Sequence, residues 1–247
     1  MAQEWIDGRN AVAEVLLNPR RQAFQLQVAQ GAQITGRLAE IVELARRKNI
    51  PASFVPRANL DKRFGEKHQG VVLEASGYVY AEMPDIFERA KERGEALFVL
   101  LLDVLQNPQN VGTLLRTAEA VGVHGVVIPT ARTAEVTPSV VNASSGATEH
   151  LLIARSNLAQ AITELKAQDV WIAGLDGGPG SQPIAQARLD GALGLVVGSE
   201  GSGMRALTRK ACDFIVALPM RGQIESLNAA VAGSVALYLA YMAREAR

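Results

Sequence analysis

Five side chains in the second half of the sequence combine residue types and positions that could act on a ligand. Asn110 and Arg116 lie six residues apart across the start of a predicted helix, which places Arg116 about one and a half turns inside it. Glu200 lies in a glycine-rich run, and Ser226 and Asn228 begin the last predicted helix. Amides, a hydroxyl, a carboxylate and a guanidinium together indicate hydrogen bonding to a polar substrate, and a guanidinium is well suited to a phosphate.

Each of these side chains also has a simpler interpretation. Asn110 and Ser226 are typical helix N-caps, and capping alone would explain either residue. The stem of Arg116 could lie along the apolar surface made by its neighbours while its charge stays in water. Asn228 is a poor residue for a helix interior, so the pair formed with Ser226 favours hydrogen bonds to a ligand or to a facing chain.

Two predicted strands end beside these residues. The apolar run at 193–197 stops at Gly198, and the apolar run at 214–218 stops at Pro219. Open α/β sheets place their ligand sites at the carboxyl ends of strands. The sequence therefore predicts that both strand ends form the floor of a ligand site.

The glycine-rich run at 198–203, Gly-Ser-Glu-Gly-Ser-Gly, resembles a phosphate-binding loop only loosely. It lacks the spacing of the dinucleotide fingerprint and the Gly-Lys-Ser/Thr ending of a P-loop. The carboxylate of Glu200 would repel a phosphate at this position. The run therefore favours an uncharged, adenosine-bearing ligand held by backbone groups.

The elements predicted from residue 96 onwards alternate between helix and strand. Near-continuous apolar runs indicate strands buried on both faces of a parallel sheet, at 97–102, 125–128, 151–154, 170–175, 193–197 and 214–217. Thr137 and Pro138 fit the N-cap and the first position of a helix, and the closing helix is expected from 226 to about 243. The region 96–247 is predicted to be one α/β domain.

The first part of the chain predicts a separate small α/β/α domain at 1–75. Its strands are expected at 24–28, 52–55 and 70–74, and its helices at 11–16, 36–49 and 58–64. A connector and a charged amphipathic helix occupy 76–95.

Charge is divided unequally along the chain. Residues 1–75 contain 11 Lys and Arg against 8 Asp and Glu, a balance of +3, and residues 76–247 contain 14 against 17, a balance of −3. Basic residues of the first region cluster at 20–21, 46–48 and 62–68. Any one cluster is typical of a solvated face, but three together favour a surface that faces a polyanion.

Several classes of protein are disfavoured by what the sequence contains. A single cysteine, Cys212, excludes an intrachain disulfide framework and a cysteine-based zinc site. The histidines, His68, His124 and His150, show no metal-ligand spacing, so no metal is expected. No apolar run is long enough to cross a membrane and no signal-peptide pattern begins the chain, so a cytoplasmic location without membrane contact is expected.

Three segments resemble the three motifs of the SpoU (TrmH) family of RNA 2′-O-methyltransferases, in the SPOUT superfamily. They are Asn-Pro-Gln-Asn-Val-Gly-Thr-Leu-Leu-Arg-Thr-Ala at 107–118, Leu-Val-Val-Gly-Ser-Glu-Gly-Ser-Gly at 195–203, and Leu-Pro-Met at 218–220 with Ile-Glu-Ser-Leu-Asn-Ala-Ala-Val-Ala at 224–232. Gly-Arg-Asn-Ala-Val at 8–12 and His-Gln-Gly at 68–70 resemble the substrate-binding domain of the subgroup that methylates a guanosine ribose in 23S ribosomal RNA. The resemblance spans nearly the whole chain.

This resemblance implies S-adenosylmethionine as methyl donor, a SPOUT-type catalytic domain with a deep C-terminal trefoil knot, and a homodimer with its sites near the interface. It implies that the first domain resembles ribosomal protein L30e and binds RNA. It implies that the cofactor lies against Val197, Gly198, Leu218, Met220 and Leu227. It implies that the reacting ribose is surrounded by Asn110, Arg116, Glu200, Ser226 and Asn228.

The hypothesis that follows is in-line transfer of the sulfonium methyl to a ribose 2′-hydroxyl. Because a free guanidinium is almost never deprotonated, Arg116 is expected to bind the adjacent phosphate and the developing alkoxide. A role as the base is the alternative within the family. Holding the two reactants in position would supply much of the acceleration.

Three other interpretations stay open. An adenosine-nucleotide enzyme on a conventional doubly wound sheet is one, although no dinucleotide fingerprint follows the first strand of the second domain. A non-catalytic RNA-binding factor for ribosome assembly is another, although every motif position that the chemistry needs is occupied. The third is the same chemistry on a transfer RNA or on an antibiotic-resistance site of ribosomal RNA.

Overall fold

The computed structural model describes residues 3–131, 133–201, 203–224 and 226–246, and these form two compact units. The first unit contains residues 3–79 and 135–150, and the second contains 80–134 and 151–246. Ser202 of the second motif and Glu225 of the third lie outside the described residues. Within the described ranges, no helix has both the length and the apolar character to cross a bilayer.

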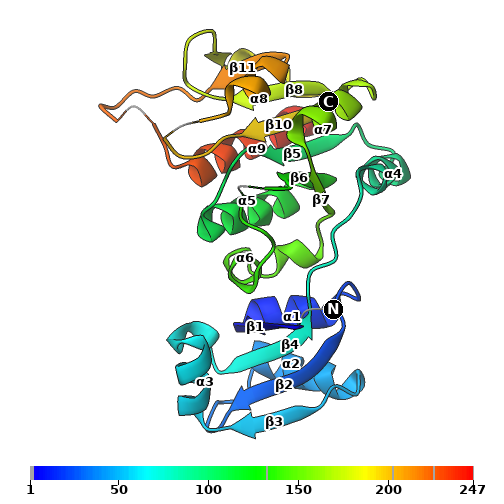
Figure 1. The fold of residues 1–247 in the computed structure, drawn as a ribbon, viewed down its shortest axis with the longest axis vertical. Coiled ribbons are helices and arrows are strands. Elements are labelled where there is room, and N and C mark those ends of the chain that lie inside the picture. The colour runs from blue at the N-terminus through cyan, green and yellow to red at the C-terminus, as the bar shows by residue number, and fades with distance from the viewer. Residues whose placement is uncertain (1–2, 132, 202, 225, 247) are drawn as a thin grey trace. The chain divides into compact units, whose positions relative to one another are not determined.

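The first unit is built on a four-stranded sheet with the strand order β1-β4-β2-β3 (Figure 1). The strands are β1 (Gln3–Asp7), β2 (Ala23–Ala29), β3 (Ala52–Val55) and β4 (Val71–Ser76). The helices are α1 (Arg9–Leu17), α2 (Arg37–Arg47) and α3 (Arg57–Phe64), followed by the single turn η1 (Glu66–His68). The predicted layered α/β arrangement of this region is confirmed, with β1 as an additional strand that the sequence interpretation missed.

Apolar periodicity explains these layers. Helices α1 and α2 pack against each other and bury the apolar positions that were used to predict them. On the other side, Leu60 and Phe64 of α3 pack with Trp5 and Val72 of the sheet. In β1 only Ile6 is fully buried, so its pattern is too short to predict a strand.

The segment 135–150 groups with the first unit, although the sequence interpretation placed it in the second domain. It contains α6 (Pro138–Ala143) and the turn η2 (Ala147–Glu149). Asn142 donates a hydrogen bond to Asp7 at 2.9 Å, and Glu149 pairs with Arg21 at 3.1 Å. Both side chains of that ion pair are fully buried. The sequence could not show this packing because the partners are more than 100 residues apart.

The second unit is an α/β layer structure with a seven-stranded sheet in the order β7-β6-β5-β10-β8-β11-β9. Its strands are β5 (Phe98–Leu102), β6 (Gly125–Pro129), β7 (Ile153–Ser156), β8 (Trp171–Leu175), β9 (Gln182–Pro183), β10 (Leu193–Val197) and β11 (Phe214–Ala217). All neighbouring strands run parallel. The predicted parallel sheet is therefore confirmed.

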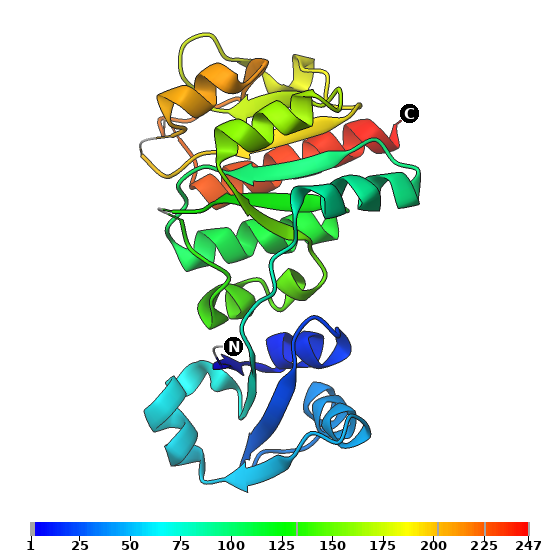
Figure 2. The same ribbon diagram turned by 45° about the vertical axis from the view of Figure 1, so that its right-hand side comes forward.

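Helices cover both faces of this sheet (Figures 1 and 2). They are α4 (Met83–Arg93), α5 (Pro108–Ala120), α7 (Leu158–Lys166), α8 (Ala206–Ala211) and α9 (Ala229–Glu245), with the turn η3 (Ile184–Gln186). Helices α5 and α9 pack together, and α4 shares an apolar cluster with α7. Because both faces are covered, the central strands are apolar at every position.

Two helix starts differ from the simpler capping interpretation. Helix α5 is capped by Asn107, whose side chain accepts a hydrogen bond from the backbone of Gln109 at 2.8 Å. Helix α9 is capped by Asn228, which accepts from the backbone amides that follow it at 2.9 and 3.2 Å. Pro108 at the first helical position explains the earlier start of α5. Asn110 therefore lies inside α5, and Ser226 lies before α9.

The buried pair of Glu149 and Arg21 is expected to be a main support of the first unit. Replacing Glu149 with Gln removes the charge but keeps the shape, and leaves the guanidinium of Arg21 buried with only part of its compensation. We expect a loss of about 3 kcal/mol in the free energy of unfolding, measured by urea denaturation. The control is Glu40→Gln, at an exposed pair, which should change stability by no more than about 0.5 kcal/mol. Equal stability of the two variants would contradict this account.

Candidate functional site

A cavity of about 720 Å³ lies at the carboxyl ends of β8, β10 and β11. Its described lining residues are Leu175, Asp176, Gly177, Val197, Gly198, Ser199, Glu200, Gly201, Gly203, Ala217, Leu218, Met220, Ser226, Leu227, Asn228, Ala229 and Ala232. They come from the loops that follow the three strands and from the first turn of α9. The cavity therefore occupies the edge of the sheet where the sequence predicted a ligand site.

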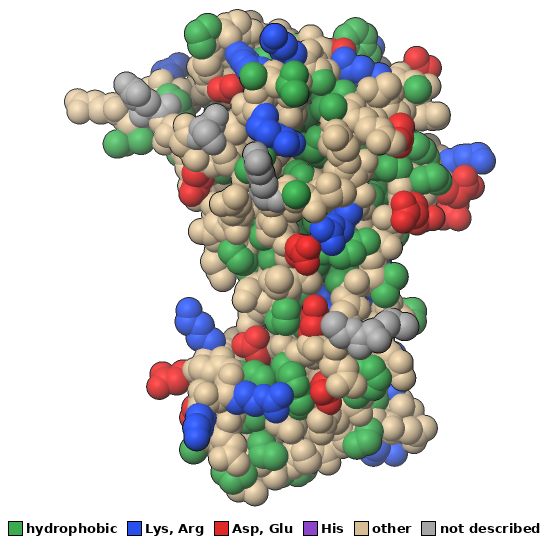
Figure 3. Space-filling view, viewed as in Figure 1, with side chains coloured by type: hydrophobic (Ala, Val, Ile, Leu, Met, Phe, Trp, Pro, Cys, Tyr) green, Lys and Arg blue, Asp and Glu red, His purple; other side chains and the backbone are tan. Residues whose placement is uncertain are grey.

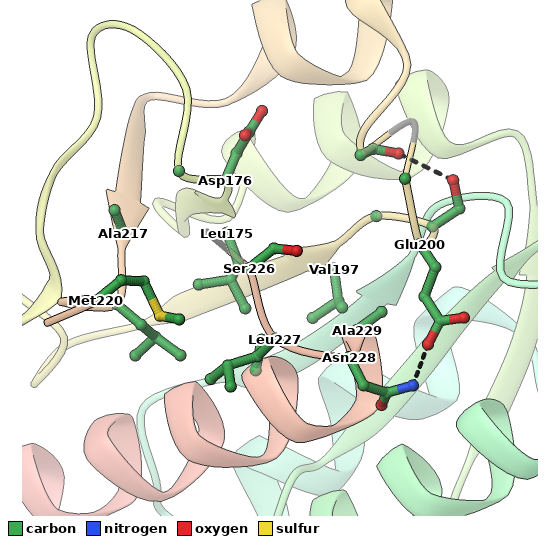
Figure 4. A pocket seen from close by; sticks show the side chains of 17 residues that line it. Leu175, Asp176, Val197, Glu200, Ala217, Met220, Ser226, Leu227, Asn228 and Ala229 are labelled. Carbon is green, nitrogen blue, oxygen red and sulfur yellow. Dashed lines mark hydrogen bonds between the residues drawn. The ribbon is translucent and has the colours of Figure 1, made fainter. Parts of the chain in front are cut away.

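Three of the predicted polar residues meet at one side of this cavity. Asn110 donates a hydrogen bond through Nδ2 to Oε1 of Glu200 at 2.9 Å. The side-chain amide of Asn228 donates to the same oxygen, and to Oδ1 of Asn110 at 3.2 Å. Figure 4 shows Glu200 extended towards Asn228, with Met220 on the opposite side of the cavity. We call Asn110, Glu200 and Asn228 the amide–carboxylate cluster.

The amide–carboxylate cluster joins all three sequence motifs. Asn110 lies in α5, Glu200 in the loop after β10, and Asn228 at the start of α9. Because Asn228 also caps α9 through its oxygen, its amide group has one defined orientation. The same side chain therefore caps α9 through its oxygen and contacts Glu200 through its amide nitrogen.

The loop after β10 is closed on itself. The backbone groups of Ser199 and Gly203 exchange two hydrogen bonds, at 3.0 and 3.1 Å. Gly198 faces this closure so closely that a Cβ atom there would lie 2.4 Å from the carbonyl carbon of Gly203. Gly201 and Gly203 have φ values of +79° and +64°, a region that favours glycine. The glycines are therefore needed for the shape of the loop.

The apolar residues predicted to hold a cofactor line this cavity, and Ser226 does too. Val197 is buried at the end of β10, whereas Leu227 and Met220 are partly exposed beside the opening. In Figure 4, Ser226, Leu227 and Val197 lie between Met220 and Glu200. A ligand here would contact apolar side chains and backbone together.

Arg116 differs from the other predicted residues. It is exposed on α5 and is not among the residues that line the cavity. Its neighbours Leu114, Leu115 and Ala118 are buried, but a helix turns 100° per residue, so these core residues do not surround it. The guanidinium of Arg116 is therefore not enclosed by its apolar neighbours in sequence.

Asp176 is a lining residue that the sequence interpretation missed. It follows β8, accepts a hydrogen bond from the backbone of Gly178 at 3.0 Å, and lies 3.7 Å from Arg209. A carboxylate directly after a buried strand was the available signal. The charged side chains among the described lining residues, Asp176 and Glu200, are both acidic. This lining favours a ligand with positive charge over the uncharged ligand inferred from the sequence.

The histidines and the cysteine have structural contacts elsewhere. His68 is buried between Asp61 and the backbone of Gly70, and His124 is hydrogen-bonded to Glu95. Burial lowers the pKa of the His124 imidazole. Burial also raises the pKa of the Cys212 thiol to about 11. In the described part of the chain, no three His, Cys, Asp or Glu side chains are grouped as a metal site.

Two protein-family models match this chain. Residues 97–238 match the SpoU rRNA Methylase family, and residues 5–81 match the RNA 2′-O ribose methyltransferase substrate binding family. The chain belongs to the SpoU methylase family. The first match contains the whole cavity and all three motifs, and the second coincides with most of the first unit.

Similar proteins extend over the full length of the chain. YacO of Bacillus subtilis, named as a TrmH family tRNA/rRNA methyltransferase, is 41% identical over 249 residues, which cover 98% of this chain and 96% of that protein. A Staphylococcus aureus protein named for the same family is 38% identical, covering 97% and 96%. The fold is also that of AviRb from Streptomyces viridochromogenes, a SpoU methyltransferase solved in complex with AdoMet. That likeness has a TM-score of 0.82 at 22% identity and covers 99% of this chain and 92% of AviRb.

The contact between Gly198 and the loop closure gives a direct test of the site geometry. In Gly198→Ala the new methyl group would overlap backbone atoms that cannot rotate away, so the loop must move. We expect a loss of about 2 kcal/mol in the free energy of unfolding. The control is Gly177→Ala, which adds a methyl group to the same cavity lining where no atom lies within 4 Å, with an expected change below about 0.5 kcal/mol. Chemical denaturation measures both, and an undisturbed Gly198→Ala protein would show that the described loop is wrong.

Proposed function

We propose that this chain transfers the methyl group of S-adenosylmethionine to a ribose 2′-hydroxyl of RNA. The observation that carries the proposal is the amide–carboxylate cluster, which joins the three family motifs beside one cavity. A guanosine of 23S ribosomal RNA is the proposed substrate, because the motifs at 8–12 and 68–70 resemble the subgroup with that target.

The cavity fits such a cofactor. Its acidic side chains, Asp176 and Glu200, suit a ligand with a positive sulfur, and its apolar residues suit an adenosine group. When bound, S-adenosylmethionine supplies a methyl carbon made electrophilic by the sulfonium charge. Its binding is assigned to the backbone at Gly198, Leu218 and Leu227 and to the side chains of Val197 and Met220.

The amide–carboxylate cluster is proposed to orient the reacting ribose. Both amides donate to Oε1 of Glu200, which fixes the carboxylate and positions Oε2. A positioned carboxylate oxygen can accept a hydrogen bond from a hydroxyl and hold it for in-line attack. Ser226, on the cavity wall beside Asn228, is proposed to add a further hydrogen bond to the ribose.

Arg116 is proposed to bind an RNA phosphate. It is exposed and lies about 9 Å farther along α5 than Asn110, at the rise of 1.5 Å per residue. A guanidinium is in general a poor base but a good phosphate ligand. The phosphate bound by Arg116 would lie outside the cavity, on the surface of α5.

Arg116→Ala is expected to abolish methyl transfer and to leave S-adenosylmethionine affinity within about twofold, because the cavity lining is untouched. Radiolabelled methyl transfer measures the first quantity and calorimetric titration the second. The control is Arg188→Ala, an exposed arginine outside the cavity lining of the same unit, which should methylate as the unchanged protein does. Methylation at the normal rate by Arg116→Ala would remove Arg116 from the mechanism.

Not every basic cluster of the first unit fits the polyanion-facing surface that the sequence predicted. Arg21 is buried and pairs with Glu149, and Arg46 and Arg47 both pair with Glu43 on their own helix. These two arginines hold the pKa of the Glu43 carboxyl at about 2. On the face shown in Figure 3, acidic and basic side chains are interspersed rather than gathered into one basic patch.

Another basic group lies on the surface of α3 and η1. Lys62, Arg63 and Lys67 are exposed on α3 and η1. The guanidinium of Arg63 lies 4.5 Å from the ring centre of Trp5 and 5.0 Å from that of Phe64. Exposed cations beside aromatic rings are typical of surfaces that bind unpaired RNA bases and phosphates. We propose that this group, the α3 basic surface, binds the RNA.

A double variant, Lys62→Ala with Lys67→Ala, tests the α3 basic surface. We expect weaker binding to ribosomal RNA fragments and a shallower dependence of affinity on salt, with a slope reduced by about one to two. The matched control removes the same charge elsewhere, as Arg46→Ala with Arg47→Ala on α2, and should keep the original slope. Equal losses in the two double variants would contradict a localised RNA surface.

A homodimer is proposed from the outer face of α9. Val231, Val235, Tyr238 and Met242 recur at intervals of four, three and four residues, so they form one stripe, and all four are exposed. The stripe is continuous with exposed Leu227 at the cavity opening. A second copy covering this stripe would bury apolar surface and also enclose the opening.

Val235→Glu is expected to convert the dimer to a monomer, because it places a charge in the centre of the proposed interface. Sedimentation equilibrium measures the change. The control is Glu245→Gln at the end of the same helix, which should keep the dimer. A monomeric starting protein would exclude the proposal.

A C-terminal trefoil knot is also proposed. The strand order supports it, because β10 lies between β5 and β8 although β8 comes earlier in the chain, and β11 lies on the other side of β8. The insertion of a later strand between two earlier strands agrees with a chain end that threads through a loop, which ordinary connections do not do. The cytoplasmic location expected from the sequence stays a prediction.

The proposed reaction is tested by incubating the protein with S-adenosylmethionine and ribosomal RNA, digesting the RNA to nucleosides, and identifying products by mass spectrometry. We expect a 2′-O-methylguanosine that is absent without protein, and primer extension at low dNTP maps its position. The same product in transfer RNA alone would change the substrate. Cofactor binding without any product would favour the non-catalytic assembly factor, and binding of NAD instead would favour a nucleotide enzyme.

A further inference from the structure

Asp103 is a fully buried carboxylate at the end of β5, outside the cavity lining. Its Oδ1 accepts a hydrogen bond from Nε of Arg205 at 2.6 Å, and its Oδ2 accepts one from the backbone amide of Arg205 at 2.8 Å. The backbone amide of Asp103 donates to the carbonyl oxygen of Val197 at 2.8 Å. Three hydrogen bonds therefore connect the residue that follows β5 to two residues that are distant in the sequence.

Those two residues flank the loop that carries Glu200. Val197 is the last residue of β10, and Arg205 is the N-cap residue of α8. Asp103 thus fastens both ends of the segment 198–204. Within this segment, the backbone groups of Ser199 and Gly203 are hydrogen-bonded to each other. Any change at its two ends must move Glu200 or break that pairing.

The chain on the other side of Asp103 leads to Asn110. Val104, the next residue, has a φ of +61°, which is strained for a β-branched side chain. A buried carboxylate is costly without a partner, and an apolar residue of similar size would fill the same space at lower cost. The buried carboxylate of Asp103 and the strained backbone of Val104 both make the junction of β5 and α5 less stable. Their presence indicates that this junction serves a purpose other than the stability of the fold.

We propose that Asp103 is a positioning residue for methyl transfer. Its ion pair with Arg205 holds the 198–204 loop so that Glu200 meets Asn110 and Asn228 and the cavity keeps its shape. The consequence of this role for catalysis rests on the proposed function. The effect of Asp103 on the loop and on cofactor binding does not depend on which RNA is methylated.

The test compares Asp103→Asn with Asp213→Asn. Asp213 is the control, since it too accepts a backbone hydrogen bond, from Ile172 at 2.8 Å, and pairs with a basic side chain, Lys166, at 2.7 Å. Its partners lie in β8 and α7 rather than at the ends of the 198–204 loop, and its side chain is 24% exposed whereas that of Asp103 is fully buried. Both variants are expected to lower the melting temperature. Only Asp103→Asn is expected to weaken S-adenosylmethionine binding by about tenfold or more, measured by calorimetry well below the melting temperature.

Hydrogen exchange without cofactor gives a second readout. In Asp103→Asn, the amides of Ser199 and Gly203 should exchange faster than in the unchanged protein, whereas in Asp213→Asn they should not. Wild-type affinity and exchange in Asp103→Asn would overturn the proposal, and so would equal effects in the two variants. If both readouts behave as expected but the unchanged protein methylates no RNA, the proposed function fails and the positioning role stands.

Variants at the exposed partner keep the test possible if Asp103→Asn does not fold. The side chain of Arg205 is 48% exposed, so substitutions there should allow folding. Arg205→Met should reproduce the loss of cofactor affinity, and Arg205→Lys should restore part of it. Arg205→Met with unchanged affinity and unchanged exchange at Ser199 and Gly203 would overturn the proposal.

Discussion

The candidate site depends on one set of hydrogen bonds, in which two side-chain amides converge on a single oxygen of Glu200. Asn110 and Asn228 reach that oxygen from α5 and from the start of α9, so the contact exists only when the first turns of these two helices meet the loop after β10. A carboxylate that accepts two amide hydrogens is fixed in direction. The cavity shares two of these three segments, because the loop after β10 and the start of α9 also form part of its wall.

The parallel sheet explains why this meeting is possible. Strand β10 lies between β5 and β8, so their carboxyl ends, with the loops that carry Asp103, Glu200 and Asp176, open at one edge. Strands β5 and β10 are apolar and buried at every position, and Asp103, Glu200 and Asp176 lie in the loops after the strands. The residues that stabilise the sheet therefore lie within the strands, and the polar residues of the site lie in the loops that follow. The glycines at 198–203 allow the loop after β10 to close tightly.

Much of the fold could be predicted from apolar periodicity, and the site could be predicted only in part. Parallel strands such as 193–197 can be recognised in the sequence because they are apolar at every position. Capping depends on which amide a side chain reaches, so the assignments at Asn110 and Ser226 needed the coordinates. Partners far apart in sequence, such as Glu149 and Arg21, leave no local signal. Arg116 shows the converse, since its apolar neighbours in sequence lie on another face of the helix.

Hydrogen–deuterium exchange on addition of S-adenosylmethionine tests the central claim most directly, namely that one cavity formed by the loops after β8, β10 and β11 holds the cofactor. The account predicts slower exchange in peptides that contain 175–177, 197–204, 217–220 and 226–232. It predicts no change in peptides of α2 and β3 in the first unit. Protection confined to the loop after β6, or no protection anywhere at saturating cofactor, would contradict the account.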